Sequence, residues 1–177
     1  KQFVHTGVKA IFIGGKMVNA FLIARKEKSK MIPFSLSDIP RTLLSVNEEK
    51  NQKIINEINL AGEIIDFAND KKVNLIFPDD YKCVDDFKAP TFFVESEPDF
   101  EKVLQLDLGP KTIENFKNTI LSDGVENVFW NGPLGAYDHP TNHDYVEGSL
   151  ELAQLLFEEA LTNQNFSVVI GGGDSAA

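Results

Sequence analysis

The sequence has little of three things: cysteine, basic charge and long apolar runs. Cys83 is the only cysteine among 177 residues, which excludes a disulfide framework within the chain and argues against a cysteine-based zinc site. Lysine and arginine number 17 against 27 acidic residues, a formal net charge of -10, so most of the surface would repel nucleic-acid phosphates. No apolar run is long enough to cross a bilayer. With 42% hydrophobic residues, the chain fits one globular domain.

Short apolar runs that end at turn residues recur at the spacing of an α/β protein. Strands are predicted at 10–13, 73–77, 91–94, 127–130 and 167–170, and another ends at 108; helices are predicted at 17–26, 51–69, 111–121 and 144–161. Gly62 leaves open whether 51–69 is one helix or two. Residues 37–52 are polar and are interpreted as a surface connection or insertion. The alternation predicts a parallel sheet covered on both faces, with ligands beyond the carboxyl ends of its strands.

Residues 168–175 (VVIGGGDS) carry the sharpest single signal. A buried strand runs into three glycines and then into Asp174 and Ser175, which are favourable helix N-cap residues. Glycine lets a phosphate approach the backbone closely, and the free N–H groups of a following helix bind anions. Taken alone, the pattern fits a phosphate loop and a plain Gly-rich turn equally well, and it matches neither a Walker A motif nor GxGxxG.

Three other turns follow predicted strands, at 12–17 (FIGGKM), 106–112 (LDLGPKT) and 129–138 (FWNGPLGAYD). An asparagine at a strand end can donate to a phosphate, and a nearby carboxylate can accept from ribose hydroxyls. For the first two segments a simple turn is the favoured isolated interpretation, and it is also the alternative for the third.

In this order, the four segments resemble the C-terminal, nucleotide-binding domain of phosphoglycerate kinases, from about Ile11 to Ala177. The pairing of WNGP at 130–133 with GGGDS at 171–175 is the specific part. The resemblance implies an α/β, three-layer Rossmann-like domain with a mostly parallel sheet. Residues 1–177 would then form a partial C-terminal domain, truncated at both ends, without the N-terminal domain that binds 3-phosphoglycerate.

The resemblance also assigns roles around a nucleotide, residue by residue. Gly14 and Gly15 would line the adenine pocket, with Leu36 and Leu106 as apolar walls. The residues that would contact the rest of the nucleotide are Asn131 at the phosphates, Pro133 at the adjoining wall, Asp138 at the ribose, and Gly172, Gly173, Asp174 and Ser175 as the phosphate loop. Gly172, Gly173 and Asp174 would have the catalytic roles, and Asp174 would place Mg²⁺.

The sequence departs from the family pattern at a few positions. Lys16 stands in place of the third glycine of the first motif, where its side chain could extend outward. Asp138 replaces a glutamate and is one methylene shorter, while Ser149 replaces a threonine and keeps the hydroxyl.

We therefore expect half of a glycolytic enzyme that uses ATP/ADP and Mg²⁺ to move a phosphoryl group between 1,3-bisphosphoglycerate and ADP. The parent protein would be a monomeric cytoplasmic enzyme that binds neither nucleic acid nor membrane, and this part alone would be inactive because the cationic groups that phosphoryl transfer needs would lie elsewhere. The alternatives are an inactive domain of the same family, used as a structural or binding module in a larger assembly, and another nucleotide-binding α/β protein.

Overall fold

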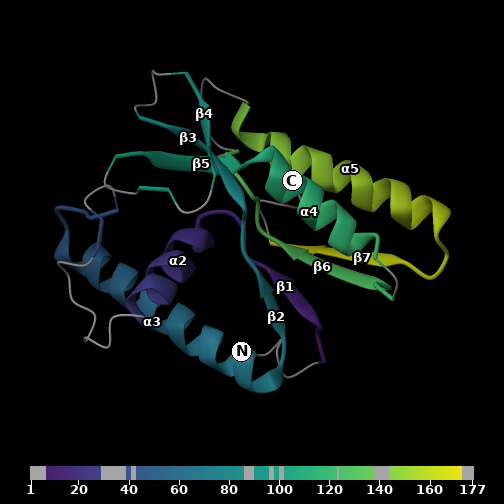
Figure 1. Cartoon of the computed structure of the whole chain (residues 1–177), viewed down its shortest axis with the longest axis horizontal. Coiled ribbons are helices and arrows are strands. Elements are labelled where there is room, and N and C mark those ends of the chain that lie inside the picture. The colour runs from purple at the N-terminus through teal and green to yellow at the C-terminus, as the bar shows by residue number, and fades with distance from the viewer. Residues whose placement is uncertain are drawn as a thin grey trace. The chain divides into compact units, whose positions relative to one another are not determined.

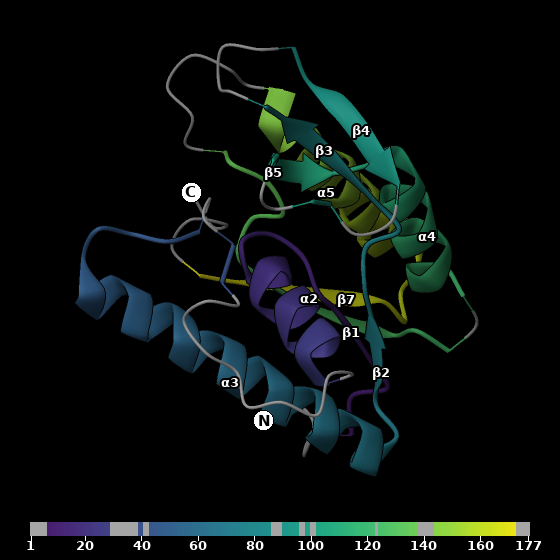
Figure 2. The ribbon, with the colours of Figure 1, turned by 60° about the vertical axis from the view of Figure 1, so that its left-hand side comes forward.

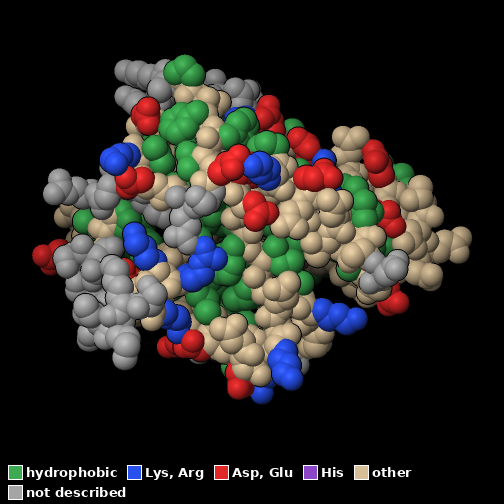
Figure 3. Space-filling model, viewed as in Figure 1, with side chains coloured by type: hydrophobic (Ala, Val, Ile, Leu, Met, Phe, Trp, Pro, Cys, Tyr) green, Lys and Arg blue, Asp and Glu red, His purple; other side chains and the backbone are tan. Residues whose placement is uncertain are grey.

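The computed structural model describes residues 7–28, 39–40, 43–85, 90–95, 98–99, 102–122, 124–137 and 144–172. The chain forms two compact units. The first comprises Lys1–Phe77 with Asp99–Leu104, and the second comprises Pro78–Pro98 with Gln105–Ala177. On the face viewed in Figure 3, acidic and basic side chains are interspersed.

The first unit contains β1 (Ala10–Phe12), α2 (Met17–Lys28), α3 (Glu48–Lys71) and β2 (Asn74–Ile76). The two strands pair in parallel from Ala10↔Asn74 to Phe12↔Ile76. Helices α2 and α3 lie side by side (Figure 2). Their buried side chains are those of Val18, Phe21, Leu22, Ile23, Ala24, Ile58, Ala61 and Ala68. Two helices thus connect two parallel strands, as the alternating pattern predicted.

Helix α3 is one continuous helix, so the two-helix alternative is wrong. Its N-cap is Asn47, whose side-chain oxygen accepts from the backbone N–H groups of Glu49 at 2.9 Å and Lys50 at 3.2 Å. The helix ends at Lys71, and its C-cap residue, Lys72, adopts the left-handed conformation with φ 56°. The polar segment predicted to be a connection therefore ends at Asn47, and residues 48–52 belong to the helix instead.

The second unit contains β3 (Asp80–Val84), β4 (Phe92–Glu95), β5 (Leu104–Leu108), α4 (Pro110–Ile120), β6 (Asn127–Asn131), the short 3-10 helix η2 (Asp144–Val146), α5 (Glu147–Thr162) and β7 (Ser167–Gly171). Strands β6 and β7 pair in parallel and are connected through α5, which lies beside α4 (Figure 1). Strand β3 lies between β4 and β5 and runs antiparallel to β4.

The predicted α/β class is confirmed, and so is parallel pairing, although β3 and β4 pair in antiparallel fashion. Strand β3 was not predicted, because its sequence DYKCV carries two charged residues where an apolar run was expected. All five of its residues are buried. The helix predicted at 144–161 is divided in the structure: its first three residues form η2, and α5 begins at Glu147.

Candidate functional site

The carboxyl ends of β6 and β7 bring together two of the predicted binding residues. Asn131, the last residue of β6, lies opposite Gly171 in the parallel register. The next residue, Gly172, has φ 87°, a conformation that side chains other than glycine rarely adopt. A Cβ atom at Gly172 would lie 3.0 Å from Oδ1 of Asn131. The amide side chain of Asn131 and the start of the Gly-rich turn therefore form one exposed edge.

Residues 131–137, here called the β6 loop, are held to β5 and α5 by two hydrogen bonds that the backbone N–H groups of the loop donate. The N–H of Leu134 donates to Oγ of Ser149 at 2.9 Å. The N–H of Ala136 donates to the carbonyl oxygen of Leu106 at 2.8 Å. The hydroxyl that Ser149 shares with the family's threonine thus has a structural role, since it holds the loop that begins at Asn131.

The carboxylate of Asp107 lies directly beneath the β6 loop. Asp107 has no exposed surface and accepts the N–H groups of Leu108 at 2.8 Å and Gly148 at 3.0 Å. A Cβ atom at Gly135 would lie 2.6 Å from Oδ1 of Asp107 and would overlap the carbonyl oxygen of Tyr145. The loop can approach Asp107 this closely only because residue 135 is glycine.

Burial raises the pKa of Asp107 to about 6, because an ionised carboxylate loses its water shell in the interior. The hydrogen bonds from Gly148 and Leu108 and the charge of Lys82 lower its pKa, and the charge of Glu147 raises it. Lys82 comes from the middle of β3, is 6% exposed, and forms an ion pair with Glu147 at 2.5 Å. The interior below the loop therefore holds a buried carboxylate and a buried cation from neighbouring elements.

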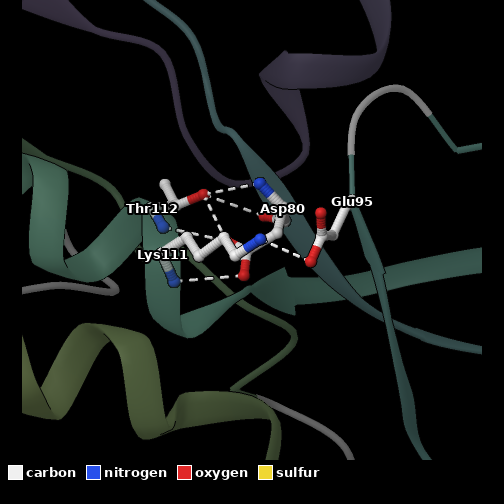
Figure 4. A network of polar contacts seen from close by, with 4 residues as sticks. All are labelled: Asp80, Glu95, Lys111 and Thr112. Carbon is white, nitrogen blue, oxygen red and sulfur yellow. Dashed lines mark hydrogen bonds and ion pairs between the residues drawn. The ribbon is translucent and has the colours of Figure 1, made fainter.

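A second buried carboxylate, Asp80, caps helix α4 from strand β3 (Figure 4). The N-cap residue of this helix is Gly109, which offers no capping side chain. Asp80 takes this role, accepting the N–H groups of Lys111 at 3.1 Å and Thr112 at 2.8 Å and the Thr112 hydroxyl at 2.8 Å. The side chain of Lys111 also forms an ion pair with Glu95. Because the N-terminus of α4 already binds the carboxylate of Asp80, its N–H groups are not available to a phosphate. The candidate phosphate site therefore lies at the other turns.

The predicted adenine residues belong partly to the first unit. Gly14 and Gly15 follow β1, and Gly15 turns the chain into α2 with φ 59° while its carbonyl oxygen accepts from Val18 at 3.1 Å. The side chain of Lys16 is exposed, as its expected outward extension requires. Leu106 and Pro133 lie in the second unit. Leu106 is only 7% exposed, and its carbonyl oxygen accepts the hydrogen bond that holds the β6 loop.

Five predicted site residues lie outside the described residues: Leu36, Asp138, Gly173, Asp174 and Ser175. The predicted Mg²⁺ ligand Asp174 is among them. In the part of the chain that is described, no group of three or more histidine, cysteine or acidic side chains is arranged to hold a metal ion. None of the described helices is both long enough and apolar enough to span a membrane.

The buried charges were not identified as site residues from the sequence. Asp107 lies inside a segment that the motifs marked, whereas Asp80 begins the unpredicted strand β3. Both carboxylates accept from helices 30 or more residues away in sequence, and local sequence patterns do not reveal such long-range contacts. An acidic residue within an otherwise apolar strand was the available sign, because a buried carboxylate requires hydrogen-bond donors.

The sequence matches the protein family described as phosphoglycerate kinase over residues 2–177. It is 36% identical to the phosphoglycerate kinase of Plasmodium falciparum (isolate 3D7) over 136 residues, which cover 75% of this chain and 30% of that protein. It is 31% identical to that of Chlorobium phaeobacteroides (strain DSM 266) over 181 residues, covering 98% of this chain and 38% of that protein.

The fold is similar to solved structures of the same kind. A phosphoglycerate kinase from Coxiella burnetii superposes with a TM-score of 0.60 at 21% identity, covering 99% of this chain and 38% of that one. One from Pyrococcus horikoshii superposes with a TM-score of 0.64 at 20% identity, covering 94% of this chain and 36% of that one. The chain thus spans about a third of the length of the relatives it matches.

Proposed function

The chain belongs to the phosphoglycerate kinase family, and on that premise we propose that it is the nucleotide-binding part of a phosphoglycerate kinase. The complete protein would move a phosphoryl group between 1,3-bisphosphoglycerate and ADP, as a monomeric enzyme of glycolysis in the cytoplasm. This part would supply the residues that hold ADP or ATP.

The observation that carries the proposal is the meeting of Asn131 with Gly172 at two adjacent strand ends. In open parallel sheets, ligands bind beyond the carboxyl ends of the strands. The Asn131 side-chain amide can donate to a phosphate oxygen, and Gly172 lets a phosphate approach the backbone without meeting a Cβ atom. Both residues are exposed, which leaves this edge open to a ligand.

The proposed catalytic contribution of this part is positioning and electrostatic stabilisation. In phosphoryl transfer the protein mainly aligns the reacting groups and stabilises the charge on the transferring oxygens. Gly172 and Gly173 would direct backbone N–H groups at the phosphates, and Ser175 would contact them beside this turn. Gly14, Gly15, Leu36, Leu106, Pro133 and Asp138 would hold the adenosine portion.

Magnesium fits the chemistry of this edge. Mg²⁺ usually binds through one or two carboxylates together with substrate phosphates, and Asp174 follows the glycines that would hold those phosphates. The bound ion would neutralise negative charge on the phosphate oxygens. The exposed amide oxygen of Asn131 lies on the same edge and adds an oxygen donor of the kind that Mg²⁺ prefers.

Catalysis would also require residues beyond this chain. The proposed site contains glycines, an amide and carboxylates, whereas the transferring phosphoryl group needs cationic partners. We therefore expect these 177 residues alone to bind Mg²⁺-ADP without catalysing transfer.

The alternative function is a catalytically inactive domain of the same family, used as a structural or binding module. Lys16 in place of glycine and Asp138 in place of glutamate are the sequence features that favour it. Both stand at positions proposed to contact the nucleotide, so each could weaken nucleotide binding.

A coupled assay of the complete protein with ATP, Mg²⁺ and 3-phosphoglycerate tests the enzyme directly. We expect turnover that Asp174→Ala abolishes. Absence of turnover from a well-folded complete protein would favour the inactive module.

Nucleotide binding is tested separately by titration calorimetry with Mg²⁺-ADP. Asn131→Ala should weaken binding about tenfold, as expected for one hydrogen bond to a charged group. The matched control is Asn127→Ala, at the opposite end of the same strand, which should leave affinity unchanged. Equal effects of the two substitutions would contradict the proposed placement of the phosphates.

A further inference from the structure

We propose that Asp107 is a positioning residue for the β6 loop: its buried carboxylate fixes the loop against β5 and α5, and thereby sets the affinity of the site for nucleotide. The step from loop position to affinity rests on the proposed function. The step from Asp107 to loop position does not.

The carboxylate of Asp107 contacts its own strand and two segments that are distant in sequence. Oδ1 of Asp107 accepts from Leu108 at the end of β5, and Oδ2 accepts from Gly148 in the first turn of α5. The β6 loop packs on the same group at Gly135, where a Cβ atom would come within 2.6 Å of Oδ1. The position of the carboxylate therefore limits how closely the loop can approach both elements.

The residue of α5 that donates to Asp107 is next in sequence to the residue of α5 that holds the β6 loop. Gly148 donates to Asp107, and the next residue, Ser149, accepts from the N–H of Leu134 in the loop. We expect loss of the Gly148 hydrogen bond to loosen the first turn of α5 at the point where it holds the loop. Leu134 is three residues from Asn131 along the chain, so a displacement of Leu134 would be transmitted to Asn131.

A carboxylate suits this role because it can accept several N–H groups at once. An ionised carboxylate has acceptor sites on both oxygens, whereas protonation converts one oxygen into a donor. The two N–H groups at Asp107 approach different oxygens, so protonation must weaken one of these contacts. The charged groups that act on Asp107 are Lys82 from β3 and Glu147 from α5.

The ionised form is therefore the one that holds the loop most firmly. The buried ammonium group of Lys82 favours this form, while burial itself opposes it. With the pKa of Asp107 near 6, both forms are accessible close to neutral pH. Protonation weakens a hydrogen bond within the folded protein, so the loop should loosen locally as the pH falls through this value. Global unfolding exposes the carboxylate to water and therefore responds to pH in the opposite direction.

The test is Asp107→Asn in the complete protein, with hydrogen–deuterium exchange of residues 131–137 measured without nucleotide. The amide keeps the size of the carboxylate but presents an N–H₂ group to one of the two backbone donors. We expect exchange in this segment to be about tenfold faster, equivalent to one lost hydrogen bond. The control is Asp79→Asn, which removes an exposed carboxylate of the same unit and should leave exchange in the loop unchanged.

Affinity for Mg²⁺-ADP distinguishes a failure of this inference from a failure of the proposed function. We expect Asp107→Asn to weaken binding about tenfold if the loop carries the nucleotide contact. Faster loop exchange in a protein that binds no nucleotide would leave the positioning role intact and remove the proposed function. Unchanged loop exchange would overturn the inference, as would an equal increase throughout the second unit, which indicates a merely structural role.

A pH titration of loop exchange in the unsubstituted protein gives a second readout. After correction for intrinsic exchange, we expect extra opening of residues 131–137 below pH about 6, with no such step in Asp107→Asn. Any effect of histidine titration on exchange would be the same in both proteins, so the difference between them reports Asp107 alone. If Asp107→Asn does not fold, Asp79→Asn serves as the reference, and absence of the step in the unsubstituted protein overturns the inference.

Discussion

Asp80 and Thr112 are joined by two hydrogen bonds of 2.8 Å, in which the carboxylate accepts both the backbone N–H and the hydroxyl of the threonine. The same hydroxyl oxygen accepts from the backbone N–H of Asp79 at 2.9 Å. The start of β3 and the first turn of α4 are therefore fixed to each other (Figure 4). The carboxylate that caps α4 comes from strand β3 and not from the residues that precede the helix.

Replacing Asp80 with alanine should destabilise the protein by about 2–4 kcal/mol, because buried N–H groups of α4 would lose their acceptor. Chemical unfolding measures this change through the midpoint concentration of urea. Asp79→Ala is the matched control, because Asp79 is exposed and loses only a contact with Asn115. We expect it to cost below about 0.5 kcal/mol. Similar costs for both substitutions would contradict the assigned capping role.

Gly135→Ala should disturb both folding and binding, because the added methyl group would overlap the carboxylate of Asp107 and the carbonyl oxygen of Tyr145. Neither group is the free end of a flexible side chain, so the loop itself must move. We expect a loss of about 1–3 kcal/mol in unfolding free energy and weaker binding of Mg²⁺-ADP. Unaltered stability, measured by urea unfolding, would show that the loop does not pack on Asp107 as described.

Gly62→Ala should have the opposite effect. Gly62 lies within the continuous helix α3, where glycine is less favourable than alanine by about 1 kcal/mol. The added Cβ atom would lie 3.4 Å from Cε of Lys28, the movable end of a long side chain. We expect an increase in stability of about 0.5–1 kcal/mol, measured as a higher melting temperature or urea midpoint. A lower value would indicate that the helix is interrupted at this position.

The raised pKa of Asp107 predicts a specific pH dependence of stability. The folded state binds this proton more tightly than the unfolded state, since the pKa rises from 3.8 to about 6 on folding. The contribution of Asp107 to stability is therefore fully present below pH about 4, is lost as the pH rises to about 6, and is constant above that. The total change amounts to about 3 kcal/mol.

The measurement compares urea unfolding of the unsubstituted protein and Asp107→Asn between pH 4 and pH 7. The difference in unfolding free energy should shift against the unsubstituted protein across this range, because only it carries the titrating carboxylate. A constant difference would show that Asp107 does not titrate there. A shift in the opposite direction would mean that folding lowers its pKa instead.

Much of the fold followed from local patterns. Apolar runs ending at glycine predicted β1, β6 and β7, because a short buried strand and its turn are determined by neighbouring residues. The alternating pattern also predicted that ligands bind beyond the carboxyl ends of the strands, and the structure places Asn131 and Gly172 at two adjacent ends. Strand β3 could not be recognised in this way, because its two charged residues resemble those of a surface segment.

By itself, the sequence determined the α/β class, most element positions, the family motifs and the two turns that form the candidate phosphate edge. Only the tertiary structure decided how the charges of β3 and β5 are accommodated. Asp80 accepts hydrogen bonds from Thr112, 32 residues away, and Lys82 pairs with Glu147, 65 residues away. A buried charge is tolerated only when partners converge on it, and that convergence depends on how distant segments pack.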